Sequence, residues 1–204
     1  MYKDPAEPSQ SPDSPGEIMR VPINGGTAQE VMAVKKNVSW AGCSSSPSKL
    51  CAIAERTEDR KQAIIIAFDR LNGRTAEVAR IGFDPNVNDW SLALSPDGRQ
   101  FVLVRRPNSP IQILSLHGDV IREIRVGWRN LKGSTWLPDA RGLLVTSVTQ
   151  GGATLLHVNM QGQAHVLTQN RGVDYIFGVP SPDGRHLAIV HDADNKNMRM
   201  MENF

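Results

Sequence analysis

Short apolar runs separated by polar bends recur along the chain from about residue 17 onward. Runs of four to eight residues that are bounded by turn-forming residues are typical of β-strands. Each of four proline-centred turns is followed by such a run, a polar bend and a second run, and in the first three cases by a glycine turn and a further run. The pattern predicts an all-β chain built from repeated groups of antiparallel strands. The runs directly after the proline turns are 50–54, 101–104, 143–146 and 187–190.

The proline turns set the period of this pattern, because their prolines are 49, 42 and 44 residues apart. Two turns carry the complete Ser-Pro-Asp-Gly sequence, in which proline presets φ, Ser and Asp bind nearby backbone groups, and Gly adopts an unusual φ. The third turn has Ala140 in place of Gly, and the first lacks both Asp and Gly. The residues that we assign to these structural turns are Pro47; Ser95, Pro96, Asp97 and Gly98; Pro138 and Asp139; and Ser181, Pro182, Asp183 and Gly184.

Four short antiparallel strands every 40 to 50 residues describe one blade of a β-propeller. A single four-stranded sheet cannot bury both of its faces, so neighbouring blades must stack. We therefore expect a partial propeller of about four blades, the last one lacking its final strand, preceded by an orphan hairpin and a disordered, Pro-rich leader or linker. The hairpin supplies two strands where one is missing, which favours a segment of a larger propeller over a small closed ring. The expected ranges are 1–16 for the leader, 17–34 for the hairpin, 39–82, 88–127, 131–169 and 173–204 for the blades, and 17–204 for the whole propeller segment.

Composition and charge exclude two classes of function. The 23 Lys and Arg residues nearly balance the 21 Asp and Glu residues and are interspersed with them, so no basic footprint of nucleic-acid binding is present. The longest apolar stretch, 63–68, is far shorter than the roughly 20 residues that span a bilayer. Residues 1–16 also lack the basic flank and apolar core of a signal peptide. We expect no nucleic-acid partner and no membrane insertion by this segment.

The sequence contains no catalytic, cofactor or metal motif in a suitable context. Residues 42–46 depart from the nucleophile elbow of serine hydrolases, and no α/β pattern surrounds them. The polar bend at 192–197 lacks the central glycine and the bidentate Glu of a calcium loop, so it is interpreted as a solvated hairpin loop. The five histidines are dispersed. We therefore predict no enzyme activity, no cofactor and no metal ion for this chain.

Cys43 and Cys51 are the only cysteines. The segment between them has the composition of a turn, so the two residues can face each other across a hairpin. A disulfide would require an oxidising compartment and Cα atoms within about 7 Å. The alternative is that both are small buried apolar residues, and the sequence leaves this choice open.

Aromatic residues precede the proline turns at comparable places: Trp40, Trp90, Trp136 and Phe177. One hypothesis is that they form an aromatic ring that lines the central channel and holds a ligand. The more common role of aromatic residues repeated in this way is packing between blades. Polar loops at the open ends of the blades are a second candidate contact surface, because rigid scaffolds present function on loops. These loops are 56–61, 105–110, 128–132 and 191–196.

The Ser-Pro-Asp-Gly-Arg turns at 95–99 and 181–185, each followed by an apolar strand, resemble those of the TolB-like, WD-repeat-like propeller family. Segments 18–26, 179–188 and 197–204, together with the cysteine pair, resemble the C-terminal propeller of large acidobacterial proteins. In those proteins a serine/threonine kinase or winged-helix regulator domain is followed by a membrane span and an extracytoplasmic propeller. The resemblance covers about 17–204 and departs at Ala140, at 48–49, and at Arg199, where such endings often carry Trp.

The resemblance implies a bacterial, periplasmic location, and any kinase activity would reside in an N-terminal domain absent from this chain. Together with the lack of a catalytic motif, it leads us to expect a non-catalytic binding or scaffold propeller. This would be the sensory or protein-interaction part of a larger signalling protein, with a protein partner or a small extracytoplasmic ligand. Two alternatives stay open: the substrate-gating propeller of a prolyl-oligopeptidase-type serine peptidase, and a TolB-type periplasmic transport component.

Overall fold

The computed structural model describes residues 16–34, 38–45, 48–83, 90–107, 110–192 and 197–202. Most of the expected leader and Pro47 lie outside these ranges, as do residues 108–109 of the loop 105–110 and residues 193–196 of the loop 191–196. All regular structure in the described ranges is antiparallel β-sheet. No helix capable of crossing a bilayer occurs in that part of the chain.

The strands form five sheets in sequence order. The hairpin sheet consists of β1 (Gly16–Arg20) and β2 (Gln29–Val34). Blade 1 consists of β3 (Val38–Cys43), β4 (Leu50–Arg56), β5 (Gln62–Asp69) and β6 (Gly73–Gly82). Blade 2 consists of β7 (Trp90–Leu94), β8 (Gln100–Arg105), β9 (Ile111–Ser115) and β10 (Val120–Ile124). Blade 3 consists of β11 (Leu131–Trp136), β12 (Gly142–Thr149), β13 (Gly152–Asn159) and β14 (Ala164–Asn170), and blade 4 of β15 (Tyr175–Pro180), β16 (His186–Asp192) and β17 (Asn197–Glu202).

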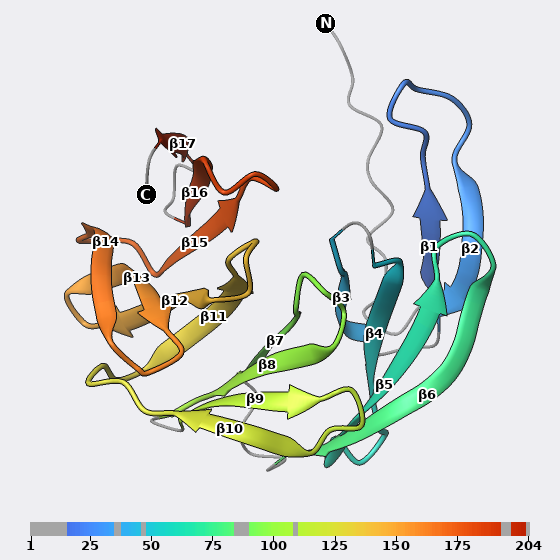
Figure 1. Cartoon of the computed structure of the whole chain (residues 1–204), viewed down its shortest axis with the longest axis horizontal. Coiled ribbons are helices and arrows are strands. Elements are labelled where there is room, and N and C mark those ends of the chain that lie inside the picture. Colours follow the sequence, from blue (N-terminus) through green and yellow to red (C-terminus); the bar gives the residue numbers. More distant parts are fainter. Residues whose placement is uncertain are drawn as a thin grey trace, which may run out of the picture.

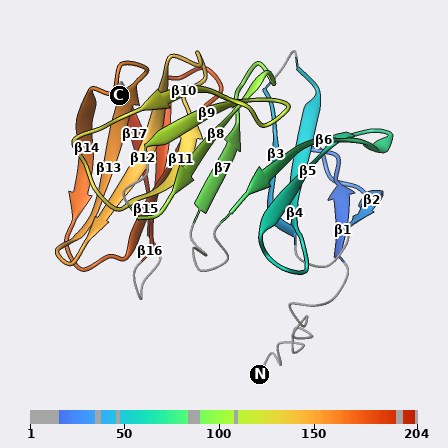
Figure 2. The same ribbon diagram turned by 90° about the horizontal axis from the view of Figure 1, so that it is seen from below.

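The sheets follow one another around an arc, with β3, β7, β11 and β15 on its concave side (Figure 1). The hairpin sheet and blade 4 stand at the two ends of the arc and are separated by a gap. Seen from below, the sheets stand side by side around the arc, and most strands run between its two opposite faces (Figure 2). This arrangement of four-stranded antiparallel sheets confirms the predicted all-β propeller fold.

The hydrophobic core is divided into layers that lie between neighbouring sheets. Successive side chains of a strand point to opposite faces, and β5 shows the consequence. Ala63 and Ile65 belong to the layer against blade 2, whereas Ile66 and Phe68 belong to the layer against the hairpin sheet. The apolar run at 63–68 is therefore continuous because its strand is buried on both faces, not because it crosses a membrane.

The two complete proline turns have the same internal hydrogen bonds. In the turn at 95–99 the Ser95 hydroxyl donates to Asp97 Oδ1 at 2.6 Å and accepts from the Gln100 N–H at 3.0 Å. Gly98 closes the turn at φ 71°, a value that glycine adopts without strain. The turn at 181–185 repeats this arrangement. Ala140 occupies the equivalent place in the diverged third turn and adopts φ 58°, so the backbone shape persists without glycine.

Gly178 in β15 provides a test of the close packing between blades 3 and 4. A Cβ atom added there would lie 3.0 Å from Leu144 Cδ1, 3.1 Å from Leu155 Cδ2 and 3.3 Å from Leu187 Cδ1. We expect Gly178→Val to lower the free energy of unfolding by roughly 1–3 kcal/mol, because the added methyl groups overpack this layer. Urea denaturation measures the change. The control is Val179→Ala at the neighbouring, 45% exposed position, for which a change within about 0.5 kcal/mol is expected; equal effects at the two positions would contradict the packing described.

The pH dependence of stability tests the hydrogen bonds that Asp183 accepts in its turn. The Ser181 hydroxyl and the Arg185 N–H stabilise its carboxylate and lower the pKa of Asp183 below its usual value of 3.8. A lowered folded-state pKa contributes stability that is present above the unfolded-state value and is lost as pH falls through the folded-state value. Asp183→Asn should therefore be less stable than the wild type near neutral pH, and the difference should shrink below about pH 4. Urea denaturation across this range tests it, and a difference independent of pH would contradict the assignment.

Candidate functional site

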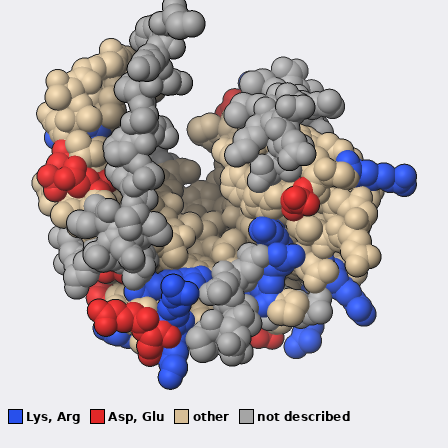
Figure 3. Space-filling model, turned by 180° about the vertical axis from the view of Figure 1, so that it is seen from behind, with Lys and Arg blue, Asp and Glu red and all other residues tan. Residues whose placement is uncertain are grey.

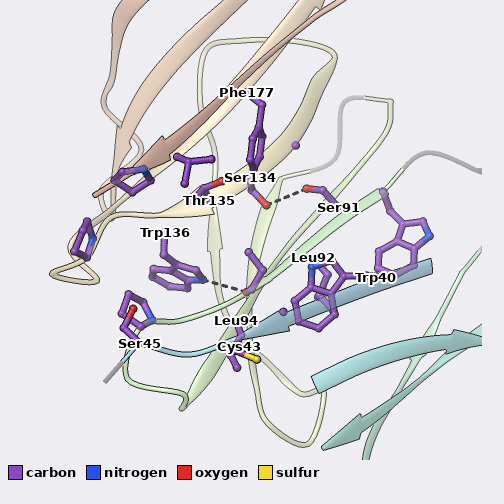
Figure 4. Close-up of a pocket in the computed structure, with 18 of the residues that line it drawn as sticks. Trp40, Cys43, Ser45, Ser91, Leu92, Leu94, Ser134, Thr135, Trp136 and Phe177 are labelled. Carbon is purple, nitrogen blue, oxygen red and sulfur yellow. Dashed lines mark hydrogen bonds between the residues drawn. The ribbon is translucent and has the colours of Figure 1, made fainter. Parts of the chain in front are cut away.

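A pocket of about 520 Å³ lies on the concave side of the arc, between β3, β7, β11 and β15 (Figure 4). Each of these strands is the inner edge of its sheet, so backbone groups that have no ladder partner on that side border the pocket. The pocket extends along the full length of the inner strands. At one end, which we call the mouth end, it is lined by Ser39, Trp90, Gly133 and Tyr175, where the strands begin. At the other end, the turn end, it is lined by Pro96, Pro138 and Pro182.

The described residues that line the pocket are uncharged, and several of them carry hydroxyl groups. Ser91 of β7 and Ser134 of β11 point toward each other and share a hydrogen bond of 2.9 Å (Figure 4). Ser39 donates to the Ala54 carbonyl within blade 1. Sequence reasoning did not single out Ser91 and Ser134, although their separation of 43 residues matches the period of the proline turns. These hydroxyl groups therefore form hydrogen bonds with one another or with the backbone.

The aromatic residues occupy different places in the four blades, contrary to the expectation of one common place. The residues that open the four turns are Ser44, Ser95, Leu137 and Ser181, whose N–H groups each bond to the carbonyl of the residue that closes the turn. Trp40 and Phe177 stand four residues before theirs, Trp90 stands five before, and Trp136 directly precedes its turn. Trp136 is 5% exposed and donates its indole N–H to the Ala93 carbonyl at 3.1 Å. This residue packs between blades 2 and 3, as repeated aromatics usually do, while still touching the pocket.

The other aromatic residues of the pocket are partly exposed. Trp40 packs edge-on against Phe101, with ring centroids 6.1 Å apart. Trp90 stacks on Phe83 at 4.7 Å, and Tyr175 stacks on Phe177 at 6.2 Å. The pocket therefore has aromatic walls from three blades, but not the regular ring that the sequence suggested.

Basic side chains surround the mouth end and lie over aromatic faces. The Arg56 guanidinium lies 5.7 Å from the centre of the Trp90 ring, and the Lys132 ammonium lies 5.4 Å from that of Tyr175. Contacts of this kind attract a cation to the negative face of the ring. Arg56 and Lys132 come from two of the loops that the sequence nominated as a contact surface, 56–61 and 128–132.

Arg105 belongs to the loop 105–110, a third loop that the sequence predicted as a contact surface. It is half-buried. Its guanidinium lies 5.3 Å from the centre of the Phe83 ring and donates to Gln112 Oε1 at 2.9 Å and to the Gly82 carbonyl at 3.2 Å. Its Nε has no hydrogen-bond partner among the described residues. Burial lowers the pKa of the Arg105 guanidinium, because the charged form is partly removed from water.

The fold separates charges that are interspersed in the sequence. The connections at the mouth end, described in part, carry more basic than acidic residues, whereas at the turn end each of the second, third and fourth proline turns carries one Asp and one Arg. Figure 3 shows the mouth end, with Lys and Arg side chains gathered beside its hollowed centre. Among the described residues, the basic ones in and directly beside these connections include Arg56, Arg60, Lys61, Arg105, Arg106, Arg125, Arg129, Lys132 and Arg171, and the acidic ones include Glu55, Glu58, Asp59 and Asp174.

The proline turns form the floor of the pocket as well as the corners of the blades. Pro96 accepts a hydrogen bond at 3.0 Å from the Ser45 N–H of the first turn, which joins blades 1 and 2 at the turn end. Ser95, Asp97, Ser181 and Asp183 direct their side chains to the backbone of their own turns. Asp139 does the same toward the Arg141 N–H. The polar residues of these turns are therefore occupied by the scaffold.

Cys43 and Cys51 form a disulfide, with Cα atoms 4.0 Å apart. They are directly opposite each other on β3 and β4. Cys51 is fully buried, whereas Cys43 lines the turn end of the pocket. The disulfide closes the first proline turn, whose sequence is the most diverged of the four.

The described residues include no group of three or more side chains suited to bind a metal ion. Two of the five histidines, His157 and His165, face each other across β13 and β14, with ring centroids 6.4 Å apart. Burial, followed by the neighbouring His165, lowers the pKa of His157. Both lie on the outer part of blade 3, away from the pocket.

No protein-family model matches the sequence, and no curated protein matches it significantly. Among solved structures, the chain is similar to TolB from Acinetobacter baumannii, with a TM-score of 0.66 and 17% identity over 94% of this chain and 48% of that chain. It is also similar to a chain of a nidogen–laminin complex (TM-score 0.63, 15% identity, 93% of this chain and 76% of that one). A third similar structure is the β-propeller domain of the trilobed protease from Pyrococcus furiosus (TM-score 0.56, 12% identity, 93% and 62%). These similarities confirm the TolB-like propeller fold, and this chain spans about half the length of the TolB chain.

The disulfide is expected to stabilise the fold by about 2.5 kcal/mol, the chain-entropy value for a loop this short. Its removal by the double substitution Cys43→Ala with Cys51→Ala should lower the free energy of unfolding by that amount in urea denaturation. Adding a reductant should then destabilise the wild type but leave the double variant unchanged. Alkylation of the unreduced protein, followed by mass spectrometry, should modify neither cysteine; two modified cysteines in protein folded under oxidising conditions would contradict the pairing.

Proposed function

We propose that this propeller is a non-catalytic binding domain whose pocket holds a small extracytoplasmic ligand or a segment of a protein partner. In this proposal it is the sensory or interaction part of a larger signalling protein. The observation that carries the proposal is the pocket itself: about 520 Å³, with aromatic walls, no charged side chain among its described lining residues, and the inner edge strands of four sheets around it. Pockets of this size that combine apolar walls with a few polar groups are typical ligand sites.

The chemistry of the lining supports binding over catalysis. A serine nucleophile requires an adjacent base, but Ser91 is hydrogen-bonded to another hydroxyl, that of Ser134. The described lining contains no carboxylate and no histidine. Cys43, the one sulfur-bearing residue of that lining, is held in a disulfide. These side chains can orient a ligand, but no carboxylate or imidazole among the described lining residues is placed to activate a hydroxyl as a nucleophile.

An extracytoplasmic location is part of the proposal. Structural disulfides persist in oxidising compartments and are rare in the cytosol. The Cys43–Cys51 pairing therefore supports a location such as the periplasm, in agreement with the family resemblance.

A bulky side chain placed in the pocket tests the proposed function. Val179 lines the pocket on β15 and is 45% exposed, whereas Val166 on β14 is 51% exposed and lies outside the pocket. We expect Val179→Trp to abolish the binding of small molecules that raise the melting temperature of the wild type in a thermal-shift screen. Val166→Trp is the matched control and should retain their binding, because it adds the same side chain to an exposed strand position elsewhere.

Two results would contradict this proposal. One is that ligands bind Val179→Trp and Val166→Trp with equal affinity, which would mean that they bind outside the pocket. The other is turnover of a common hydrolase or phosphotransfer substrate that stays with the protein through repurification, which would show that the chain is an enzyme.

A further inference from the structure

A second, smaller pocket of about 270 Å³ lies between blades 2 and 3. Its lining comes from β8, β9 and β10 of blade 2, and from the end of β11, the third proline turn and the turn between β13 and β14 of blade 3. Trp136 is the only described residue that lines both this second pocket and the pocket on the concave side. The two pockets are therefore separate sites that share one wall.

One wall of the second pocket is an extension of the hydrophobic core. Ile113 and Trp136 belong to the buried layer between blades 2 and 3, and Ala140 and Met160 pack against that layer. Because these side chains are held by their packing, the apolar wall exists before any ligand arrives. An apolar group that enters the pocket is removed from water against this wall, which is favourable.

A β-bulge supplies the opposite wall. The pairing of β10 with β9 skips Ile121, because Val120 and Arg122 are opposite consecutive residues of β9. Consecutive side chains of a regular strand point to opposite faces, whereas a bulge re-aims a side chain. As a result, the consecutive residues Ile121 and Arg122 both line the second pocket. The bulge thus places an apolar and a cationic side chain next to each other at one site.

The two polar side chains of this lining are free to contact a ligand. Arg122 is exposed and forms no hydrogen bond or ion pair with any described residue. The side-chain amide of Gln100 likewise has no hydrogen-bond partner among the described residues. Glu123, the carboxylate next to Arg122 in sequence, accepts a hydrogen bond from Gln112 and pairs with Arg125 instead.

The surroundings of the second pocket lie within the described part of the chain. Of blades 2 and 3, only residues 108–109 are outside it, and they follow the end of β8 that is opposite to Gln100. The second and third proline turns each contribute one Asp and one Arg. Asp119, in the turn before β10, accepts a hydrogen bond from the Ser115 hydroxyl. None of these carboxylates forms an ion pair with Arg122.

We propose that the second pocket binds a small carboxylic acid with an apolar body. The Arg122 guanidinium presents parallel N–H donors that match the two oxygens of a carboxylate, and the Gln100 amide supplies a further donor. The apolar body lies against Ile113, Ile121 and Met160. Pockets for drug-sized ligands measure about 300–1,000 Å³, so the smaller volume of this one favours a body of roughly one aromatic ring. This inference is independent of the function proposed for the concave pocket.

A matched pair of ligands tests this selectivity. 3-Phenylpropanoate and 3-phenylpropanamide share one apolar body, but only the first is an anion. NMR titration of the full chain follows the Met160 methyl signal and the Ile121 backbone amide signal, because neither residue lines the concave pocket. The acid should shift both signals and bind more tightly than the amide. The absence of any shift at millimolar acid would overturn the proposal.

Substitutions of the two bulge residues separate the charged and the apolar contacts. Arg122→Gln should weaken binding of the acid roughly threefold to fivefold, the size of an exposed charge pair, and leave binding of the amide unchanged. Ile121→Ser should weaken binding of both ligands, because it removes apolar surface. Ile121 is 52% exposed, so this change leaves the core intact. Arg185→Gln, which removes an exposed arginine in the fourth proline turn, is the matched control and should bind both ligands as the wild type does.

Three results would contradict the inference. An equal loss of acid binding in Arg122→Gln and Arg185→Gln would mean that net charge alone explains the preference. Unchanged binding in Ile121→Ser would mean that the body does not enter the second pocket. Loss of acid binding in Val179→Trp, with Arg122→Gln unaffected, would place the acid in the concave pocket; this inference would then fail while the proposed function stands. Conversely, acid binding that persists in Val179→Trp and depends on Arg122 supports the second pocket whether or not the concave pocket binds a ligand.

Discussion

The structure depends on the requirement that each small sheet bury both of its faces. Neighbouring side chains of one strand enter different core layers, as Ile65 and Ile66 do on the two sides of blade 1. Only stacking against a sheet on each side satisfies such a strand. Stacking around a curve follows, and it leaves the inner strand of every blade as an edge that faces the concave side. The pocket is the direct consequence of that arrangement.

Interactions between blades protect these inner edges and shape the pocket. The Trp136 indole binds the Ala93 carbonyl of the preceding blade, and Ser91 meets Ser134 across the same junction. At the mouth end, Arg56 and Lys132 lie over aromatic rings of the next blade, Trp90 and Tyr175. Because each of these contacts joins two blades, the relative placement of the blades and the geometry of the site are set by the same interactions.

The fold was largely predictable from the sequence, and the site only in part. Proline turns and apolar runs repeat locally, so the number of strands and their grouping into blades follow from residues close together in the chain. The aromatic residues were misplaced, because a shift of one residue moves a side chain to the other face of a strand. Trp90 and Trp136 each stand an odd number of residues before their turns, whereas Trp40 stands an even number before its own. A β-bulge in β11 further changes which face each residue of that strand points to. The loops 56–61, 105–110 and 128–132 were recognised, but their common position around one opening was not.

By itself, the sequence determined the all-β class, the period of the blades, the chemistry of the turns and the lack of a catalytic motif. These properties depend on local hydrogen bonding and on the alternation of side chains within single strands. Only the tertiary structure decided which residues meet across blades. It paired Ser91 with Ser134, placed Arg56 over Trp90, and brought basic residues from several connections to the mouth end of the pocket. The physical reason is that the two ends of a blade collect residues from alternate connections, so side chains that meet at one end come from segments far apart in the sequence.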